Sequence, residues 1–143
     1  METYMKPTTA ARFFNRLLGA LIRIGFSPRG AQLLTVKGRR SGERRTTPVN
    51  PLTFGGARYL VAPRGSTHWA RNLRAVGEGE LSRGRRKEAI RVTEVADAEK
   101  PPILRVYLER WAAETKAHFG LDADASDAEL AAIAAAHPVF RIL

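Results

Sequence analysis

The sequence contains no cysteine, which excludes disulfide bonds and thiolate chemistry and fits a reducing compartment such as the cytoplasm. Histidine is also scarce. His68, His118 and His137 are spaced too widely to form a metal-ligand pair on one helix, so no metal site is expected. The chain lacks a long uninterrupted apolar run, which argues against both a transmembrane helix and a secretory signal. It also lacks repeats, low-complexity tracts and linkers, so residues 1–143 are expected to form a single domain.

Acidic residues are few in the first two thirds of the chain. Residues 1–95 contain 19 Lys and Arg against 6 Asp and Glu, a balance of +13, whereas residues 96–143 contain 5 against 8, a balance of −3. A basic body of this kind favours polyanionic partners: nucleic acid, an anionic membrane or a phosphorylated ligand. Charge by itself does not choose among them.

Residues 9–26 are predicted to form an amphipathic N-terminal helix, because their apolar side chains recur at helical spacing. Arg12, Arg16 and Arg23 lie off the apolar stripe. Two interpretations stay open. The helix packs on the body of the domain, or it lies on the inner face of the membrane with its basic flank against lipid phosphates.

The middle of the chain, residues 32–95, is predicted to consist of barrel strands around a cofactor-binding hairpin. The expected elements are strands at 33–36, 46–54 and 58–62, a short helix at 66–75, and a hairpin made by 80–82 and 89–95. Pro48 and Pro51 mark the second strand as an edge or bulged strand.

The last third, residues 98–143, is predicted to contain two helices and a final strand. Gly120 is expected to end the first helix, and Ser126 and Glu129 form a capping box that opens the second. Short strands in sequence with helices grouped at the ends indicate an α+β fold, mainly β: a small β-barrel with flanking helices.

The densest feature is the turn between the first two strands, where five cations occur within residues 37–45. Its glycines allow close backbone approach, so guanidinium groups, hydroxyls and backbone N–H groups can converge on one anion. The pattern predicts a phosphate or carboxylate site. The alternative is an exposed charged hairpin with no ligand.

A second feature follows the strand at 58–62. Gly65 frees the backbone, and Ser66 or Thr67 is expected to cap a helix whose positive N-terminus would face an anion or a ring carbonyl. Trp69, one turn into that helix, offers a flat apolar face. The alternative is a simple helix cap with a core tryptophan.

Together these segments resemble the deazaflavin-dependent nitroreductase family, whose members use the reduced deazaflavin coenzyme F420. The family pattern is a strand, then Gly-Arg-Lys/Arg-Ser/Thr-Gly, a short spacer, and an arginine before the next strand. Here it reads Gly38 to Gly42 and then Arg45. The run from Trp69 through Asn72 to Leu73 is similar to the second block of the family.

The resemblance implies a split β-barrel of the FMN-binding type, with the cofactor lying across its face. It implies that the phosphate and acidic oligoglutamate tail of the cofactor are held by Arg39, Arg40, Ser41 and Arg45. The deazaflavin and its ribityl chain would be lined by Thr46, Thr47, Pro48, Ala62, Pro63, Arg64 and Gly65. Trp69 and Asn72 would shape the pocket wall.

The implied activity is hydride transfer from reduced F420 to a small electron-poor acceptor: an activated alkene, a quinone or a nitroaromatic compound. Family members that reduce nitro compounds and quinones carry tyrosines before the last strand, whereas residues 130–136 contain none. The catalytic residues are therefore unassigned, and the candidates for proton donor are Ser66, Thr67, His68 and Tyr107.

Two other classes of function stay open. An FMN-type or haem-type split-barrel protein would share the fold, although FMN has one phosphate and no acidic tail and so needs fewer arginines. A non-enzymatic nucleic-acid binder would use the basic hairpin of residues 83–87, but its cations are not interleaved with stacking aromatics. No specific nucleic-acid partner is expected, and the oligomeric state is open.

Overall fold

The computed structural model describes residues 12, 15–19, 30–121 and 123–143. Most of the helix expected over residues 9–26 lies outside them and stays a prediction. Residues 15–19 are helical, and Leu18 packs against Ala31 and Leu33. Among the described helices, none combines the length and apolar character needed to span a membrane.

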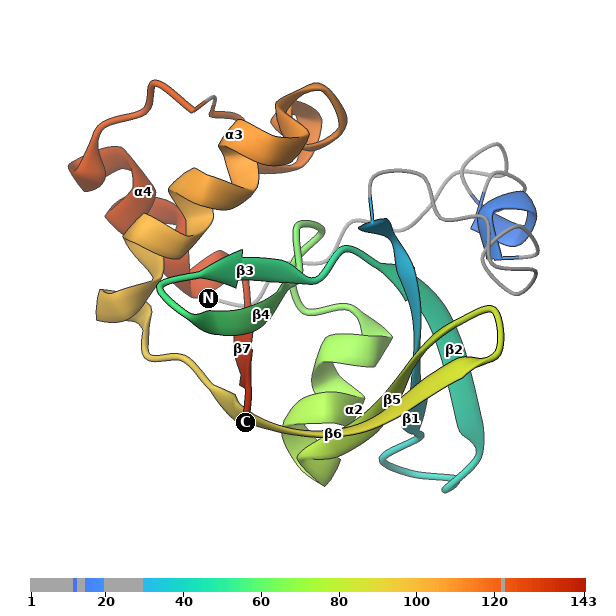
Figure 1. Cartoon of the computed structure of the whole chain (residues 1–143). Helices are drawn as coiled ribbons and strands as arrows, with labels where there is room; N and C mark the ends of the chain where they lie inside the picture. Colours follow the sequence, from blue (N-terminus) through green and yellow to red (C-terminus); the bar gives the residue numbers. More distant parts are fainter. Residues whose placement is uncertain (1–11, 13–14, 20–29, 122) are drawn as a thin grey trace.

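Seven antiparallel strands form one sheet with the spatial order β2-β1-β5-β6-β7-β4-β3 (Figure 1). The strands are β1 (Gln32–Lys37), β2 (Arg44–Val49), β3 (Leu52–Phe54), β4 (Ala57–Val61), β5 (Glu78–Arg83), β6 (Arg86–Glu94) and β7 (Val139–Ile142). β5 and β6 form the expected hairpin, and the final strand is present. Gly79 on β5 has no room for a side chain, because an added Cβ would lie 2.9 Å from the backbone oxygen of Thr35.

The sheet curls into a half-barrel, and the connection between β2 and β3 requires this shape. The two strands are opposite edges of the sheet, yet only Asn50 and Pro51 separate them in sequence. Because so short a link spans at most about 10 Å, the two edges must approach each other. The predicted split β-barrel is confirmed. The single strand predicted over 46–54 is wrong, since the chain crosses between edges at Pro51, which cannot donate to a strand ladder.

Three helices flank the sheet: α2 (His68–Val76), α3 (Lys100–Phe119) and α4 (Asp127–Ile133), with short 3-10 turns η2 (Asp97–Glu99) and η3 (Ala134–Ala136). α3 kinks at Trp111, whose φ of −129° and ψ of 34° are not helical. The helix ends before Gly120, as predicted. The predicted capping box is confirmed: Ser126 Oγ accepts from the backbone N–H of Glu129, and the Glu129 carboxylate accepts from Ser126 N–H.

The helices bury apolar residues on the two faces of the sheet. α2 packs against one face, where Leu73 joins Leu34, Val36 and Leu60 in a core cluster. α3 and α4 cover the other face of β3, β4 and β7 and form a separate cluster around Trp111. Figure 1 shows α2 enclosed by the curled sheet and α3–α4 outside it. This arrangement leaves the β1–β2 turn beside α2, at one end of the sheet.

Candidate functional site

An open hollow lies between the β1–β2 turn and α2. Its volume is about 330 Å³, and it is lined by Gly38, Arg39, Arg40, Ser41, Arg45, His68 and Asn72. We call it the arginine hollow. The fold therefore brings together five of the sequence-predicted site residues, namely Arg39, Arg40, Ser41, Arg45 and Asn72.

The β1–β2 turn is held in shape by its own backbone. Gly38 N–H donates to the Glu43 carbonyl at 2.7 Å, and Gly42 N–H donates to the Gly38 carbonyl at 3.0 Å. Gly42 has φ of +73°, a conformation that favours glycine. Ser41 Oγ accepts from Glu43 N–H at 3.2 Å. These contacts give the backbone of the turn a defined conformation.

Asn72 ties the turn to α2. Its Oδ1 atom accepts two hydrogen bonds from Arg39, one from the backbone N–H at 3.0 Å and one from Nη1 at 2.8 Å. Asn72 is buried, with 3% of its surface exposed, and Arg39 is half-buried. A buried amide that accepts twice from one residue orients that residue, and here it holds both the backbone and the guanidinium of Arg39 at the hollow wall.

The hollow is strongly basic. Three of its lining residues are arginines and none is acidic. Glu43, just outside it, approaches Arg45 at 3.6 Å, but both side chains are mostly exposed, so the pair contributes little. Three guanidinium groups without an internal acidic partner in the hollow form an environment suited to a multiply charged anion.

Strand pleating divides the residues predicted on β2. Arg45 and Thr47 lie opposite Val36 and Leu34 in register, and cross-strand partners share a face, so both are on the core side with α2. Thr46 lies on the other face, where its hydroxyl is 2.9 Å from that of Thr35. Because successive side chains alternate, Pro48 shares the face of Thr46. Thr46, Pro48 and Thr47 therefore do not line one surface, and none lines the arginine hollow.

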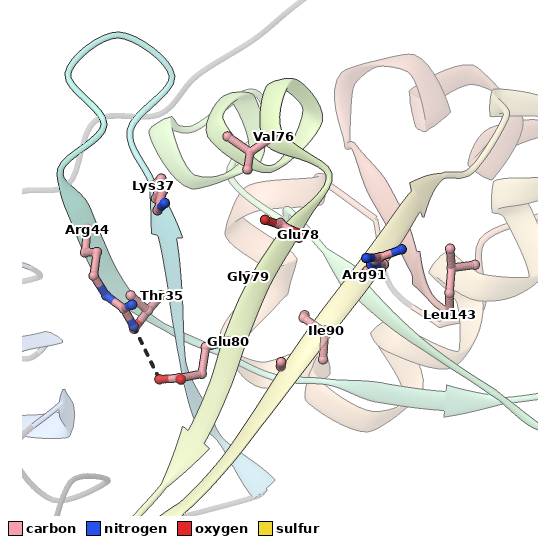
Figure 2. Close-up of a pocket in the computed structure, with 11 residues that line it drawn as sticks. Thr35, Lys37, Arg44, Val76, Glu78, Gly79, Glu80, Ile90, Arg91 and Leu143 are labelled. Carbon is pink, nitrogen blue, oxygen red and sulfur yellow. Dashed lines mark ion pairs between the residues drawn. The ribbon is translucent and has the colours of Figure 1, made fainter.

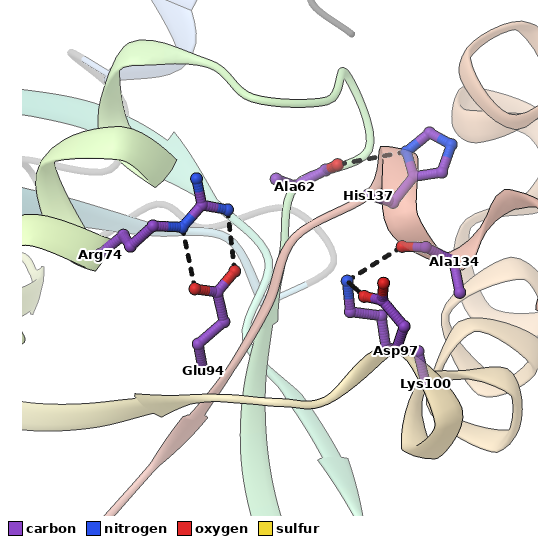
Figure 3. Close-up of polar contacts among 7 residues, drawn as sticks. All are labelled: Ala62, Arg74, Glu94, Asp97, Lys100, Ala134 and His137. Carbon is purple, nitrogen blue, oxygen red and sulfur yellow. Dashed lines mark hydrogen bonds and ion pairs between the residues drawn. The ribbon is translucent and has the colours of Figure 1, made fainter. Parts of the chain in front are cut away.

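The segment from Ala62 to Gly65 joins β4 to α2 and is fixed by the C-terminal strand region. Ala62 N–H donates to the Pro138 carbonyl at 2.9 Å. Figure 3 shows the Ala62 carbonyl facing the buried His137 ring, with Nδ1 at 3.4 Å. Gly65 has φ of +89° and donates back to Ala62 at 3.2 Å. Pro63 and Arg64 are half-buried within this segment, which does not line the arginine hollow.

The start of α2 differs from the expected capped terminus. Thr67 is the N-cap residue by position, but its side chain makes no capping hydrogen bond, and the helix begins at His68. Ser66 and Thr67 are both buried. Trp69 is half-buried and packs against Phe140, with ring centroids 6.2 Å apart, so much of its surface belongs to the core cluster.

Gly38 and His68 line the hollow, although the sequence argument did not place them in the cofactor site. His68 stands four residues before Asn72, and residues at that spacing lie on one face of a helix. Once Asn72 is assigned to the wall, helical spacing alone identifies His68. Gly38 carries no chemical signal beyond its place in the turn.

A second hollow, of about 700 Å³, lies on the opposite face of the sheet (Figure 2). Its lining includes the apolar residues Ile90 and Leu143 and side chains of both charges, and Arg44 forms an ion pair with Glu80 at 3.5 Å. Glu78 also lines it. Two carboxylates in this wall oppose an anionic ligand, so the arginine hollow is the better candidate for the acidic end of a cofactor.

Tyr107 lies in the core rather than at the hollow. It is 3% exposed and packs against Trp111 and Phe119, with ring centroids at 4.8 and 6.0 Å. Burial raises the pKa of Tyr107 to about 12, partly offset by a hydrogen bond with Asn50. A buried phenol with a raised pKa is a poor proton donor at neutral pH.

The raised pKa predicts a stability change in alkali. Between about pH 10 and 12 the unfolded chain releases the Tyr107 proton while the folded chain keeps it, so the free energy of unfolding falls as pH rises. The loss should approach about 2–3 kcal/mol. Denaturant titrations of the wild type and of Tyr107→Phe across this range measure it. The wild type should lose more stability than the variant, and parallel curves would contradict the assignment.

The fold and the hollow define a class: a split-barrel protein with a basic hollow at one end of its sheet. The family model described as F420H(2)-dependent quinone reductase matches residues 10–124 of the chain. The protein therefore belongs to the F420H2-dependent quinone reductase family. It is an oxidoreductase that uses coenzyme F420.

Solved structures agree with the fold. The structure of an F420-H2 dependent reductase (FDR-A) is 20% identical with a TM-score of 0.53, over 80% of this chain and 95% of that one. A putative pyridoxamine 5'-phosphate oxidase from Listeria innocua is 11% identical with a TM-score of 0.53, over 80% and 82%. A heme binding protein from Mycobacterium smegmatis is 14% identical with a TM-score of 0.52, over 96% and 52%. Comparison with curated proteins found no significant match.

Proposed function

We propose that the arginine hollow holds the phosphate and acidic tail of reduced F420, and that the protein presents this cofactor to a small electron-poor acceptor. The observation that carries the proposal is the convergence of Arg39, Arg40 and Arg45 on one hollow whose lining contains no acidic residue. A phosphodiester with several carboxylates is the kind of ligand that such a cluster of guanidinium groups stabilises.

The size of the hollow limits which part of the cofactor it holds. A volume of about 330 Å³ suits the anionic end and leaves the deazaflavin ring outside. On the core side of β2, Thr47 continues the face of Arg45. We place the ring along this face toward the Ala62–Gly65 segment, whose backbone is fixed by Pro138 and His137.

When bound, reduced F420 supplies the hydride, and the chain's own residues bind and orient. Asn72 holds Arg39 in place before the cofactor arrives, which lowers the ordering cost of binding. We assign the proton that accompanies reduction to solvent. Of the four candidate donors, Ser66, Thr67 and Tyr107 are buried, and His68 lies at the anionic end of the site.

The proposed acceptor is a quinone, in keeping with the family to which the chain belongs. The test is anaerobic mixing of protein, reduced F420 and one acceptor: a benzoquinone, a nitroaromatic compound or an activated alkene. The return of oxidised F420 absorbance is followed. The quinone should react fastest. Faster turnover with another acceptor would reject the quinone, and cofactor binding without turnover of any of the three would reject this acceptor class.

Separate titration of the protein with F420, followed by fluorescence, tests the cofactor site. Absence of binding at micromolar cofactor in moderate salt would reject it, and a protein that is yellow after purification would favour FMN instead.

Peripheral membrane contact through residues 9–26 also stays a prediction. Deletion of that segment should reduce sedimentation with liposomes, and unchanged pelleting would reject the contact.

A further inference from the structure

A second basic surface lies at the other end of the sheet from the arginine hollow. The β5–β6 hairpin carries Arg83, Arg85, Arg86 and Lys87, which we call the hairpin patch, and all four side chains are exposed. β1 and β5 run antiparallel and Ser82 pairs with Leu33, so Arg83 lies at the start of β1, whereas the arginine hollow follows its end. The six residues of β1 separate the two sites by about 17 Å.

The patch has no internal counter-charge. Within the described residues, its four cations make no ion pair or hydrogen bond through their side chains. Glu88, the one acidic residue between positions 82 and 88, is already engaged by Arg58, whose Nη1 donates to it at 2.9 Å. That guanidinium keeps the pKa of Glu88 below its usual range.

Two like charges face each other across the β5–β6 hairpin, and without a counter-charge their repulsion destabilises it. Arg83 and Arg86 are direct cross-strand partners, and like charges in that position destabilise a hairpin. An external anion would remove this repulsion. The patch borders an open hollow of about 650 Å³ whose wall also includes Gln32, Leu81 and Glu88, the carboxylate that Arg58 already engages.

An exposed apolar residue stands at the same end of the sheet. Leu18 packs on Leu33, which pairs with Ser82 beside the hairpin patch. The preceding residues, Arg16 and Leu17, are exposed, and 53% of the Leu17 surface is accessible. In Figure 1 the short helical segment lies near the tip of the β5–β6 hairpin. Cations and an exposed leucine at one end of the molecule match the chemistry of a phospholipid surface.

We infer that the hairpin patch docks the protein onto anionic phospholipid bilayers, with the arginine hollow facing away from the lipid. Nucleic acid fits the surface less well. Residues 78–94 include no aromatic side chain on which bases could stack, and an exposed leucine gains nothing from a phosphate backbone. This docking surface is independent of the cofactor proposal, because it uses no residue of the arginine hollow. It extends the membrane contact proposed above for residues 9–26, and the hairpin substitutions test it apart from deletion of that segment.

The test compares two triple variants of equal charge. One replaces hairpin cations: Arg83→Gln, Arg85→Gln and Arg86→Gln. The control replaces exposed cations elsewhere: Arg91→Gln, Arg110→Gln and Arg141→Gln. Full-length proteins are sedimented with vesicles of phosphatidylcholine, with and without phosphatidylglycerol, and binding to fluorescent duplex DNA is measured in the same buffer at physiological salt.

The wild type should bind vesicles that contain phosphatidylglycerol and should not bind vesicles of phosphatidylcholine alone. The hairpin variant should lose affinity by roughly a hundredfold, because each basic residue near an anionic surface contributes appreciably to binding, and the control should lose far less. Equal losses in the two variants, or no preference for phosphatidylglycerol, would overturn the inference. Hairpin-dependent binding of DNA that exceeds binding to vesicles would assign the patch to nucleic acid instead. Thermal unfolding of each variant confirms that the fold is intact.

Discussion

The combined substitution Arg39→Gln, Arg40→Gln and Arg45→Gln should lower the affinity for F420 by roughly a thousandfold. A hydrogen bond to a charged group contributes about 1.5–3 kcal/mol, so three lost guanidinium groups remove about 4 kcal/mol or more. All three side chains line the arginine hollow. Fluorescence titration of the oxidised cofactor measures the change directly, without dependence on the acceptor.

The hairpin variant described above is the matched control for this experiment. It removes the same amount of charge from the same sheet, at the end away from the hollow. Its F420 affinity should stay close to that of the wild type. If both variants weaken cofactor binding equally, the loss reflects the overall charge of the protein, and the arginine hollow is rejected as the cofactor site. A triple hollow variant with wild-type affinity would reject the site outright.

The substitution Asn72→Ala should weaken F420 binding by roughly tenfold although Asn72 carries no charge. Removing its side-chain oxygen leaves two donors of Arg39 without their acceptor, at a cost of about 1–3 kcal/mol. The β1–β2 turn should then exchange its amide hydrogens faster, and the cofactor must order the turn when it binds. Because the change acts on binding, kcat at saturating cofactor should change little.

Asn72→Asp separates positioning from simple loss of packing. The carboxylate retains an oxygen that accepts from Arg39, so the turn should keep its slow hydrogen exchange, whereas the added negative charge in the wall of the hollow should lower the affinity for the anionic cofactor. Hydrogen exchange of residues 38–43, read by mass spectrometry, reports the positioning role. If Asn72→Ala weakened binding without faster exchange in this turn, Asn72 would act as a direct ligand contact rather than through Arg39.

Several elements could be predicted from the sequence because they depend on interactions between residues that are close together in the chain. The capping box at Ser126 and Glu129 forms as expected, since a side chain and a backbone N–H three residues apart need no distant partner. The β5–β6 hairpin and the end of α3 before Gly120 follow equally local rules. The basic turn at residues 37–45 indicated an anion site for the same reason: its cations are close in sequence, so any fold would keep them close in space.

Other features depend on contacts between distant residues. The break between β2 and β3 exists because the sheet closes on itself, which periodicity along residues 46–54 cannot reveal. The expected side-chain cap at Thr67 does not form, and among the described residues the buried Thr67 hydroxyl at the β4–α2 junction has no hydrogen-bond partner. Strand alternation, once the register with β1 is known, separates Thr46 from Arg45 and Thr47.

By itself, the sequence determined that one basic turn would gather several guanidinium groups and that short strands would form a barrel. Only the tertiary structure decided that Asn72, 33 residues further along the chain, would hold Arg39, and that a second basic patch would lie at the opposite end of the sheet. The physical reason is the separation in sequence between the residues that interact. Charge density, turns and caps arise from neighbouring residues, whereas facing positions across a cavity depend on how the whole sheet curls around α2.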